Sequence, residues 1–202
     1  LPPPAASARL LEEERAFADA LPPLRRTTWT AGRLALAAAL SALGATRAPL
    51  LGTPRGAPAL PPGFVGSVSH KPRLAVALAA RDDGGGIGVD VEELARPAID
   101  ISRRVLTPAE LASADGLPEG ERWRDVLLRF SMKESIYKAV DPFVQRYVGF
   151  KEAEVDPGLR GEGVRVAAAR LALDRGEGPF DVEATWLEIA GHVVTSARVR
   201  SR

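Results

Sequence analysis

The sequence contains no cysteine, which excludes disulfide bonds, thiol nucleophiles and cysteine-ligated metal sites. It also lacks an excess of charge of one sign, because 27 Lys and Arg residues stand against 26 Asp and Glu residues. A formal net charge of +1 creates no global field for nucleic acid or for a membrane surface, so any basic site must be local. We therefore expect neither nucleic acid nor a membrane as a partner.

Long apolar runs are missing as well. The longest apolar helical stretch, residues 34–43, is too short and too rich in alanine to span a bilayer. Residues 1–4 carry neither the basic nor the apolar segment of a signal peptide, so we expect a cytoplasmic protein. What is present is ordinary for a globular chain: 46% of the 202 residues are hydrophobic, enough for one domain or for two small ones.

Helix and strand patterns occur in both halves of the chain and indicate an α+β fold with a sheet in each half. After an irregular lead-in at residues 1–8, we expect helices at 9–21 and 31–43, a loop rich in Pro and Gly at 47–63, and strands at 64–70, 74–80 and 87–91. A hairpin of these strands would bring His70 and Asp90 towards the same region. We place the boundary at a polar linker near Arg96-Pro97, which divides the chain into subdomains 1–97 and 98–202.

The second half begins with a clear helix start. Thr107 is the predicted N-cap, Pro108 the first helical residue and Glu110 the third. A long helix follows at about 120–140, and strand-like runs separated by Pro157-Gly158, Gly176 and Gly191 continue to residue 199.

Two stretches carry residues suited to phosphate chemistry. Glu134 and Lys138 are four apart, so they share one face of a helix. Asp90 and Glu92 alternate with valines, so both carboxylates point the same way at a strand end. If the fold joins the two stretches, three carboxylates and a lysine would hold Mg²⁺ on the phosphates of a substrate. The alternative for Glu134 and Lys138 is an ordinary surface pair.

Arg33 is a further candidate. It lies in the first turn of the helix expected at 31–43, where the helix dipole disfavours a cation, so a docked anion would explain it. The alternative is an exposed arginine with no ligand.

Three motifs stand in order along the chain: Gly66-Ser67-Val68-Ser69-His70, then Gly88-Val89-Asp90-Val91-Glu92, then Phe130-Ser131-Met132-Lys133-Glu134-Ser135-Ile136-Tyr137-Lys138. Together they resemble the signature of the 4′-phosphopantetheinyl transferases, in particular the monomeric Sfp/EntD-type branch. Further matches occur at Gly32-Arg33, at residues 55–58, 106–110 and 138–150, and the resemblance extends over about residues 25–155.

The resemblance implies transfer of the phosphopantetheine arm of coenzyme A to a serine of an apo acyl or peptidyl carrier protein, with release of 3′,5′-adenosine bisphosphate. It also implies two similar α+β subdomains related by a pseudo-twofold axis, with coenzyme A in the cleft between them. By this likeness Asp90, Glu92 and Glu134 bind Mg²⁺, or Mn²⁺ in its place. Glu134 is the favoured general base, Asp90 belongs to the catalytic set, and Lys138 neutralises charge on the departing bisphosphate.

The resemblance also assigns contacts with coenzyme A. Arg33 and either Arg26 or Arg25 are candidates for the 3′-phosphate, since guanidinium groups grip phosphate with two hydrogen bonds. The implied set of coenzyme A contacts is Arg26, Arg33, Arg55, Gly56, Ala57, Pro58, Ser69, His70, Lys133 and Lys138. The chain departs from the family at two positions. Ala57 stands where relatives often carry a basic residue, and Arg55 would have to supply that charge. Asp141 stands where many relatives carry an aromatic residue.

The first subdomain would thus bind the phosphates and adenine and carry Asp90 and Glu92, and the second would carry the catalytic helix and the carrier docking surface. Carrier proteins are usually acidic, and the segment 117–128, with Arg122, Trp123 and Arg124, is our docking candidate. Fatty-acid, polyketide, siderophore and nonribosomal-peptide carriers all remain open. Two other functions are weighed against this one: a Mg²⁺-dependent phosphohydrolase, and a coenzyme A-binding module without catalysis.

Overall fold

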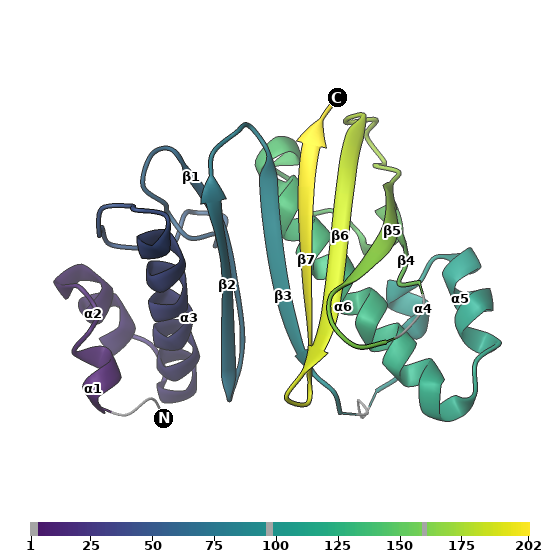
Figure 1. Cartoon of the computed structure of the whole chain (residues 1–202), viewed down its shortest axis with the longest axis horizontal. Helices are drawn as coiled ribbons and strands as arrows, with labels where there is room; N and C mark the ends of the chain where they lie inside the picture. The colour runs from purple at the N-terminus through teal and green to yellow at the C-terminus, as the bar shows by residue number, and fades with distance from the viewer. Residues whose placement is uncertain (1–3, 96–98, 159–160) are drawn as a thin grey trace. The chain divides into compact units, whose positions relative to one another are not determined.

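The computed structural model describes residues 4–95, 99–158 and 161–202. It divides into two compact units, Leu1–Gly84 and Gly85–Arg202, and each contains helices and a β-sheet, which confirms the predicted α+β class (Figure 1). We expected the boundary after residue 97, and the linker predicted at Arg96-Pro97 lies outside the described residues. In the part of the chain that is described, no helix combines the length and the apolar character needed to cross a membrane.

The first unit packs a long helix against a two-stranded antiparallel hairpin (Figure 1). Its elements are α1 (Pro4–Ser7), α2 (Glu12–Asp19), α3 (Pro23–Ala42), β1 (Phe64–Lys71) and β2 (Leu74–Arg81). Residues 4–7 are thus helical where we expected an irregular lead-in. The buried side chains of Leu36, Leu40 and Leu50 form one core cluster of this unit, with Phe64 packed against them, and Leu10, Ala18 and Trp29 form another.

Helix α3 begins at Pro23, well before the start that we expected at residue 31. Pro22 and Pro23 directly follow the helix that we expected at residues 9–21, a place where prolines commonly end a helix. Instead Pro23 is the first helical residue, where its missing N–H is not needed and its fixed φ suits the helix. Arg33 therefore lies in the middle of α3, and the prediction that it opposes the dipole of a first turn is wrong. The predicted end is confirmed, since the helix stops at Ala42 and Gly44 has a φ of +78°.

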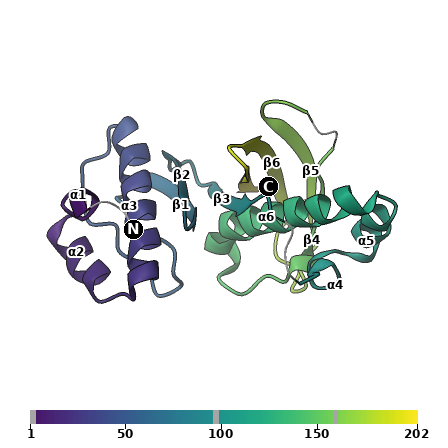
Figure 2. The same ribbon diagram turned by 90° about the horizontal axis from the view of Figure 1, so that it is seen from below.

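The second unit is a five-stranded antiparallel sheet in the order β3-β7-β6-β5-β4, with α6 along one face (Figures 1 and 2). Its elements are β3 (Gly86–Glu93), α4 (Ser102–Val105), α5 (Pro108–Asp115), α6 (Glu119–Val144), the 3-10 helix η1 (Phe150–Glu152), β4 (Ala153–Asp156), β5 (Arg165–Leu171), β6 (Phe180–Ile189) and β7 (His192–Ser201). The core between α6 and the sheet includes Met132, Ile136, Val140, Trp186 and Val193.

Strand β3 does not join the hairpin that precedes it, so the prediction that one hairpin brings His70 and Asp90 together is wrong. It pairs instead with β7, the last strand, and Asp90 lies opposite Thr195. The partner is far along the chain, where the local pattern of apolar residues gives no indication of it. This pairing also explains why the second unit begins at Gly85.

The local predictions for the second unit are confirmed. Thr107 caps α5 by accepting from the backbone N–H of Glu110 at 3.3 Å, and the Glu110 carboxylate accepts from the N–H of Thr107 at 2.7 Å. The long helix runs from Glu119 through Pro142 to Val144, slightly beyond the predicted range. The predicted turns contain Gly158, Gly176 and Gly191, all with positive φ.

Candidate active site

Two glycines allow strand β3 to lie directly on helix α6. A Cβ atom added to Gly88 would lie 1.8 Å from the carbonyl oxygen of Ser135, and one added to Gly86 would lie 1.9 Å from another carbonyl oxygen of α6. No side chain fits at these distances, so the two backbones are in contact. Since side chains alternate along a strand, Asp90 and Glu92 continue the row that the glycines begin on the side facing α6.

Asp90 is buried, and two residues of α6 hold its carboxylate. Lys138 Nζ donates to Asp90 Oδ1 at 2.8 Å and to the carbonyl oxygen of Val89 at 2.9 Å. Ser131 Oγ donates to Asp90 Oδ2 at 2.9 Å, and Thr195 Oγ1 donates to the Ser131 carbonyl oxygen at 2.9 Å. The fold therefore joins the two stretches that carry the candidate residues, through the ion pair between Asp90 and Lys138.

Glu134 lies on the same face of α6, three residues after Ser131 and four before Lys138. With Asp90 and Glu92 it offers the oxygen donors that Mg²⁺ prefers, so the donor chemistry and the facing sides of β3 and α6 fit a divalent cation. Within the described residues, however, no three His, Cys, Asp or Glu side chains gather closely enough to hold a metal ion. The ammonium of Lys138 lies on Asp90 Oδ1, where the cation would bind.

Lys133 has a structural role, in contrast to the predicted contact with coenzyme A. Its Nζ donates to Glu110 Oε2 at 2.6 Å and to the carbonyl oxygens of Val105 at 2.9 Å and Phe150 at 3.0 Å. These three acceptors use all three N–H groups of an ammonium, and only 1% of the side chain is exposed. Burial lowers the pKa of Lys133, and the carboxylate of Glu110 opposes this shift. All three N–H groups of Lys133 are therefore used within the second unit, which argues against the predicted contact with coenzyme A.

Sequence reasoning gave no role to Ser131 and Thr195. Ser131 stands in the third motif, two helical turns before Lys138, and that spacing is a usable indication that it faces the same strand. Thr195 reaches the site only through the pairing of β3 with β7, for which the sequence has no local indication.

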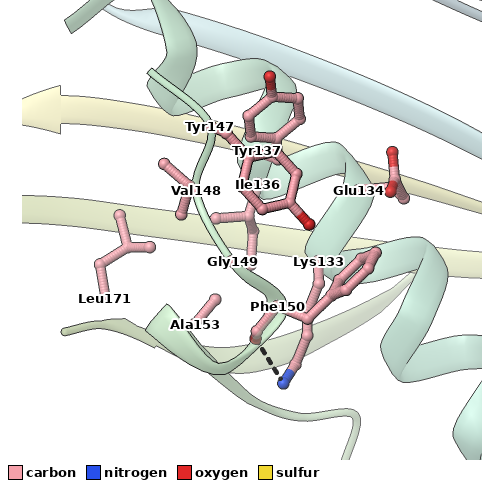
Figure 3. A pocket seen from close by; sticks show the side chains of 10 residues that line it. All are labelled: Lys133, Glu134, Ile136, Tyr137, Tyr147, Val148, Gly149, Phe150, Ala153 and Leu171. Carbon is pink, nitrogen blue, oxygen red and sulfur yellow. Dashed lines mark hydrogen bonds between the residues drawn. The ribbon is translucent and has the colours of Figure 1, made fainter. Parts of the chain in front are cut away.

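A small apolar pocket lies beside the helix face that carries Glu134 (Figure 3). The rings of Tyr137 and Tyr147 form one wall, with their centroids 6.2 Å apart. The lining residues are Lys133, Glu134, Ile136, Tyr137, Tyr147, Val148, Gly149, Phe150, Ala153 and Leu171. Apolar walls next to a carboxylate suit an uncharged, largely apolar part of a ligand.

An arginine clamp holds the loop that forms this pocket. Arg146 pairs with Glu152 and with Glu177, each at 2.6 Å. Glu152 also accepts from the backbone N–H groups of Gly149 at 2.7 Å and of Asp174 at 2.8 Å. The hydrogen bonds from Arg146 are the main cause that lowers the pKa of Glu152 to about 2. Arg146 therefore fixes the position of residues 147–150.

Arg33 is a buried cation of the first unit, with 6% of its surface exposed. Its guanidinium carbon lies 4.7 Å from the centroid of the Trp29 ring, and its Nε has no hydrogen-bond partner among the described residues. Burial lowers the pKa of Arg33, and the charge of Glu14 opposes this shift. A buried donor without an acceptor is costly, so the structure gives a better reason for an anionic ligand at Arg33 than the dipole argument did.

His70 and Ser69 follow one another on β1, so their side chains lie on opposite faces of the hairpin. His70 is on the side of α3, because a Cβ atom added to Gly32 would lie 3.6 Å from its ring. This places His70 beside the turn of α3 that contains Arg33. The contact of Ser69 with a phosphate stays a prediction.

Arg26 is engaged within the first unit, which argues against its predicted contact with the 3′-phosphate. Its guanidinium donates to the carbonyl oxygens of Ala18 at 3.1 Å and Asp19 at 2.7 Å, at the end of α2. It therefore caps that helix. Arg25, the alternative that the sequence left open, is exposed and makes no ion pair with the described residues, so it replaces Arg26 as the candidate.

The segment predicted to lie along adenine forms a compact turn. The backbone N–H of Thr53 donates to the Ala57 carbonyl at 2.7 Å, and Gly56 has a φ of +87°. Arg55, Gly56 and Ala57 are exposed and Pro58 is partly buried, so all four are accessible to a ligand. Their role stays a prediction.

In the proposed docking segment, residues 117–128, the two arginines differ in how they are engaged within the second unit. Arg122 pairs with Asp115 at 3.0 Å and with Asp100 at 3.3 Å, so its charge is largely satisfied within the second unit. Arg124 lies over the ring of Trp123, with 5.6 Å between the guanidinium carbon and the ring centroid. Arg124 and Trp123 are therefore better candidates than Arg122 for contact with a carrier.

Comparisons with known proteins agree along most of the chain. Residues 12–80 match the 4′-phosphopantetheinyl transferase N-terminal domain, and residues 86–183 match the 4′-phosphopantetheinyl transferase superfamily. The chain is 36% identical over 154 residues to 4′-phosphopantetheinyl transferase Svp of Streptomyces mobaraensis, covering 73% of this chain and 62% of the relative. It is 32% identical over 133 residues to 4′-phosphopantetheinyl transferase PptT of Mycobacterium tuberculosis, covering 65% of this chain and 58% of the relative.

The chain thus spans about 60% of the length of these curated relatives. A crystal structure of a holo-(acyl-carrier-protein) synthase from Bacillus anthracis is 26% identical, with a TM-score of 0.44, covering 58% of this chain and 96% of that chain. From the two family matches, the chain belongs to the 4′-phosphopantetheinyl transferase superfamily.

Proposed function

We propose that this protein transfers the 4′-phosphopantetheine arm of coenzyme A to a serine of an apo acyl or peptidyl carrier protein. The observation that carries the proposal is the ion pair of Asp90 and Lys138, which brings a buried carboxylate of β3 to the helix face that also carries Glu134. Both stretches lie within the superfamily match at residues 86–183.

In the proposed reaction the serine oxygen of the carrier attacks the phosphorus that bears the pantetheine arm. The bond between this phosphorus and the oxygen of the adenosine bisphosphate breaks, and 3′,5′-adenosine bisphosphate leaves. The serine proton passes to the carboxylate of Glu134, directly or through a water molecule. Lys138 balances the negative charge that develops on the departing group.

The metal dependence belongs to the same proposal. Asp90, Glu92 and Glu134 would hold Mg²⁺, or Mn²⁺ in its place, and the bound cation would neutralise the pyrophosphate of coenzyme A. The oxygen-donor chemistry of the three residues supports this assignment.

The first unit supplies the contact with the 3′-phosphate in this proposal. Arg33 has a buried Nε that lacks an acceptor, and a phosphate oxygen would satisfy it. Arg25 and His70 are the further candidates for this phosphate. In the second unit, the apolar pocket beside Tyr137 and Tyr147 suits the uncharged pantetheine arm.

The carrier is proposed to be acidic and to dock on residues 117–128, with Trp123 as an apolar contact and Arg124 as a basic one. Action as a monomer in the cytoplasm also belongs to the proposal.

Mass spectrometry of a panel of apo-carriers, incubated with coenzyme A, Mg²⁺ and this protein, tests the function. We expect at least one carrier to gain the mass of one phosphopantetheine arm on its serine, and Asp90→Asn to abolish the gain while keeping the circular dichroism spectrum of the parent. Release of free phosphopantetheine without a carrier would favour the phosphohydrolase instead. Coenzyme A binding without turnover on any carrier would leave a binding module.

A further inference from the structure

Lys138 is partly exposed and differs from Lys133, the buried lysine of α6, in ways that indicate a mobile charge. Lys133 has three acceptors and a side chain that is 1% exposed. Lys138 has two acceptors, Asp90 Oδ1 and the carbonyl oxygen of Val89, and its side chain is 26% exposed. An ammonium carries three N–H groups, so one of those on Lys138 has no acceptor within the described residues.

Each oxygen of the Asp90 carboxylate accepts a hydrogen bond in this arrangement. Lys138 holds Oδ1 and Ser131 holds Oδ2, and both approach from the same helix. The Asp90 side chain is 6% exposed, so its charge needs a counter-ion inside the fold. In the protein without ligand, Lys138 supplies that charge.

A divalent cation on Asp90 would compete with Lys138 for the same oxygen and would repel its ammonium. The stem of Lys138 has four flexible carbons, and its partial exposure leaves room for the ammonium to move. A phosphate oxygen beside the cation would offer the displaced ammonium a new acceptor. Metal and phosphate ligand would then favour each other's binding.

We propose that Lys138 is the resident counter-ion of Asp90, and that it leaves Asp90 Oδ1 for a phosphate oxygen of the ligand when a divalent cation binds. The inference rests on the proposed function, because that function supplies both the cation and the phosphate. It assigns to Lys138 a second role, in which the lysine makes metal binding depend on the phosphate ligand.

The test is the affinity for Mn²⁺ in the absence of coenzyme A, measured by the electron paramagnetic resonance signal of the free ion. Lys138→Met removes the competing ammonium, so we expect it to bind Mn²⁺ about tenfold more tightly than the parent protein does. Lys151→Met is the matched control, because Lys151 is an exposed lysine of the same unit and the net charge changes equally. Its affinity for Mn²⁺ should equal that of the parent.

A second readout covers the case in which Lys138→Met folds poorly. Lys138→Gln keeps a hydrogen-bond donor for Asp90 without a charge, and it should show the same tighter binding. Both variants should gain more in melting temperature on addition of Mn²⁺ than the parent does, because the metal replaces a missing counter-ion. Adding coenzyme A should tighten Mn²⁺ binding to the parent and do so much less in either variant.

If both Lys138 variants bind Mn²⁺ as tightly as the parent or more weakly, the proposed movement of Lys138 away from Asp90 is wrong. That outcome differs from failure of the proposed function. If no carrier is modified but the variants bind Mn²⁺ more tightly, the proposed movement of Lys138 is supported and the proposed transfer reaction is contradicted. If carriers are modified and the Lys138 variants bind Mn²⁺ no more tightly than the parent, the transfer reaction is supported and the proposed movement of Lys138 is contradicted.

Discussion

Replacing Lys133 by methionine separates a structural role of this residue from a role in ligand binding. Methionine keeps most of the length and apolar volume of the side chain but removes the ammonium that contacts Glu110, Val105 and Phe150. The carboxylate of Glu110, 2% exposed, then stays buried without its cation. Removing one partner of a buried ion pair costs about 3–5 kcal/mol, so we expect Lys133→Met to lower the free energy of unfolding by ~4 kcal/mol.

Urea unfolding followed by far-ultraviolet circular dichroism measures this loss. The exposed Lys151→Met control should change the free energy of unfolding by less than ~0.5 kcal/mol. Adding Glu110→Gln to Lys133→Met should recover part of the loss, because an amide leaves no buried charge. Where the variant is folded, its affinity for coenzyme A should match that of the parent. If Lys133→Met is as stable as the parent but binds coenzyme A more weakly, the structural role of Lys133 is refuted and its predicted contact with coenzyme A is supported.

Two further predictions concern the packing of the site and the anion contact. In Gly88→Ala the new methyl group must move from 1.8 Å to an ordinary contact of ~3.3 Å from the Ser135 carbonyl oxygen. We therefore expect the free energy of unfolding to fall by ~3 kcal/mol or more. The control is Gly120→Ala, which should not destabilise the protein because the space around Gly120 is open. Calorimetry should show that 3′-dephospho-coenzyme A binds the parent ~1.5–3 kcal/mol more weakly than coenzyme A, and Arg33→Met should reduce this difference; fully additive losses would contradict the pairing.

Predictions from the sequence succeeded where the determining contacts are local. The capping box of Thr107 and Glu110 spans three residues and is recognisable from residue types alone. The sequence did not indicate that Glu110 also serves as the counter-ion of Lys133, because that contact depends on how α5 packs against α6. The start of α3 was missed for a different reason, since Pro23 is compatible with a helix end and with a helix beginning.

The same division holds for the candidate site. Alternation and helical spacing predicted that Asp90 and Glu92 share a face and that Glu134 and Lys138 share another. No local pattern predicted that Lys138 would pair with Asp90, or that Thr195 of the last strand would donate a hydrogen bond to the carbonyl oxygen of Ser131. The family resemblance assigned Lys133 and Arg26 to the ligand, and their internal hydrogen bonds become visible only when the helices are packed.

The division of the chain at Gly84–Gly85 separates two kinds of residue. Under the proposed function, every ionisable group assigned to the chemical step follows this point, and Arg33, assigned to the far end of coenzyme A, precedes it. Substitutions in the first unit can then change how much coenzyme A is needed without changing the rate of the bond-making step. Natural selection can in this way adjust the protein to a different supply of its donor substrate while the reacting groups stay as they are.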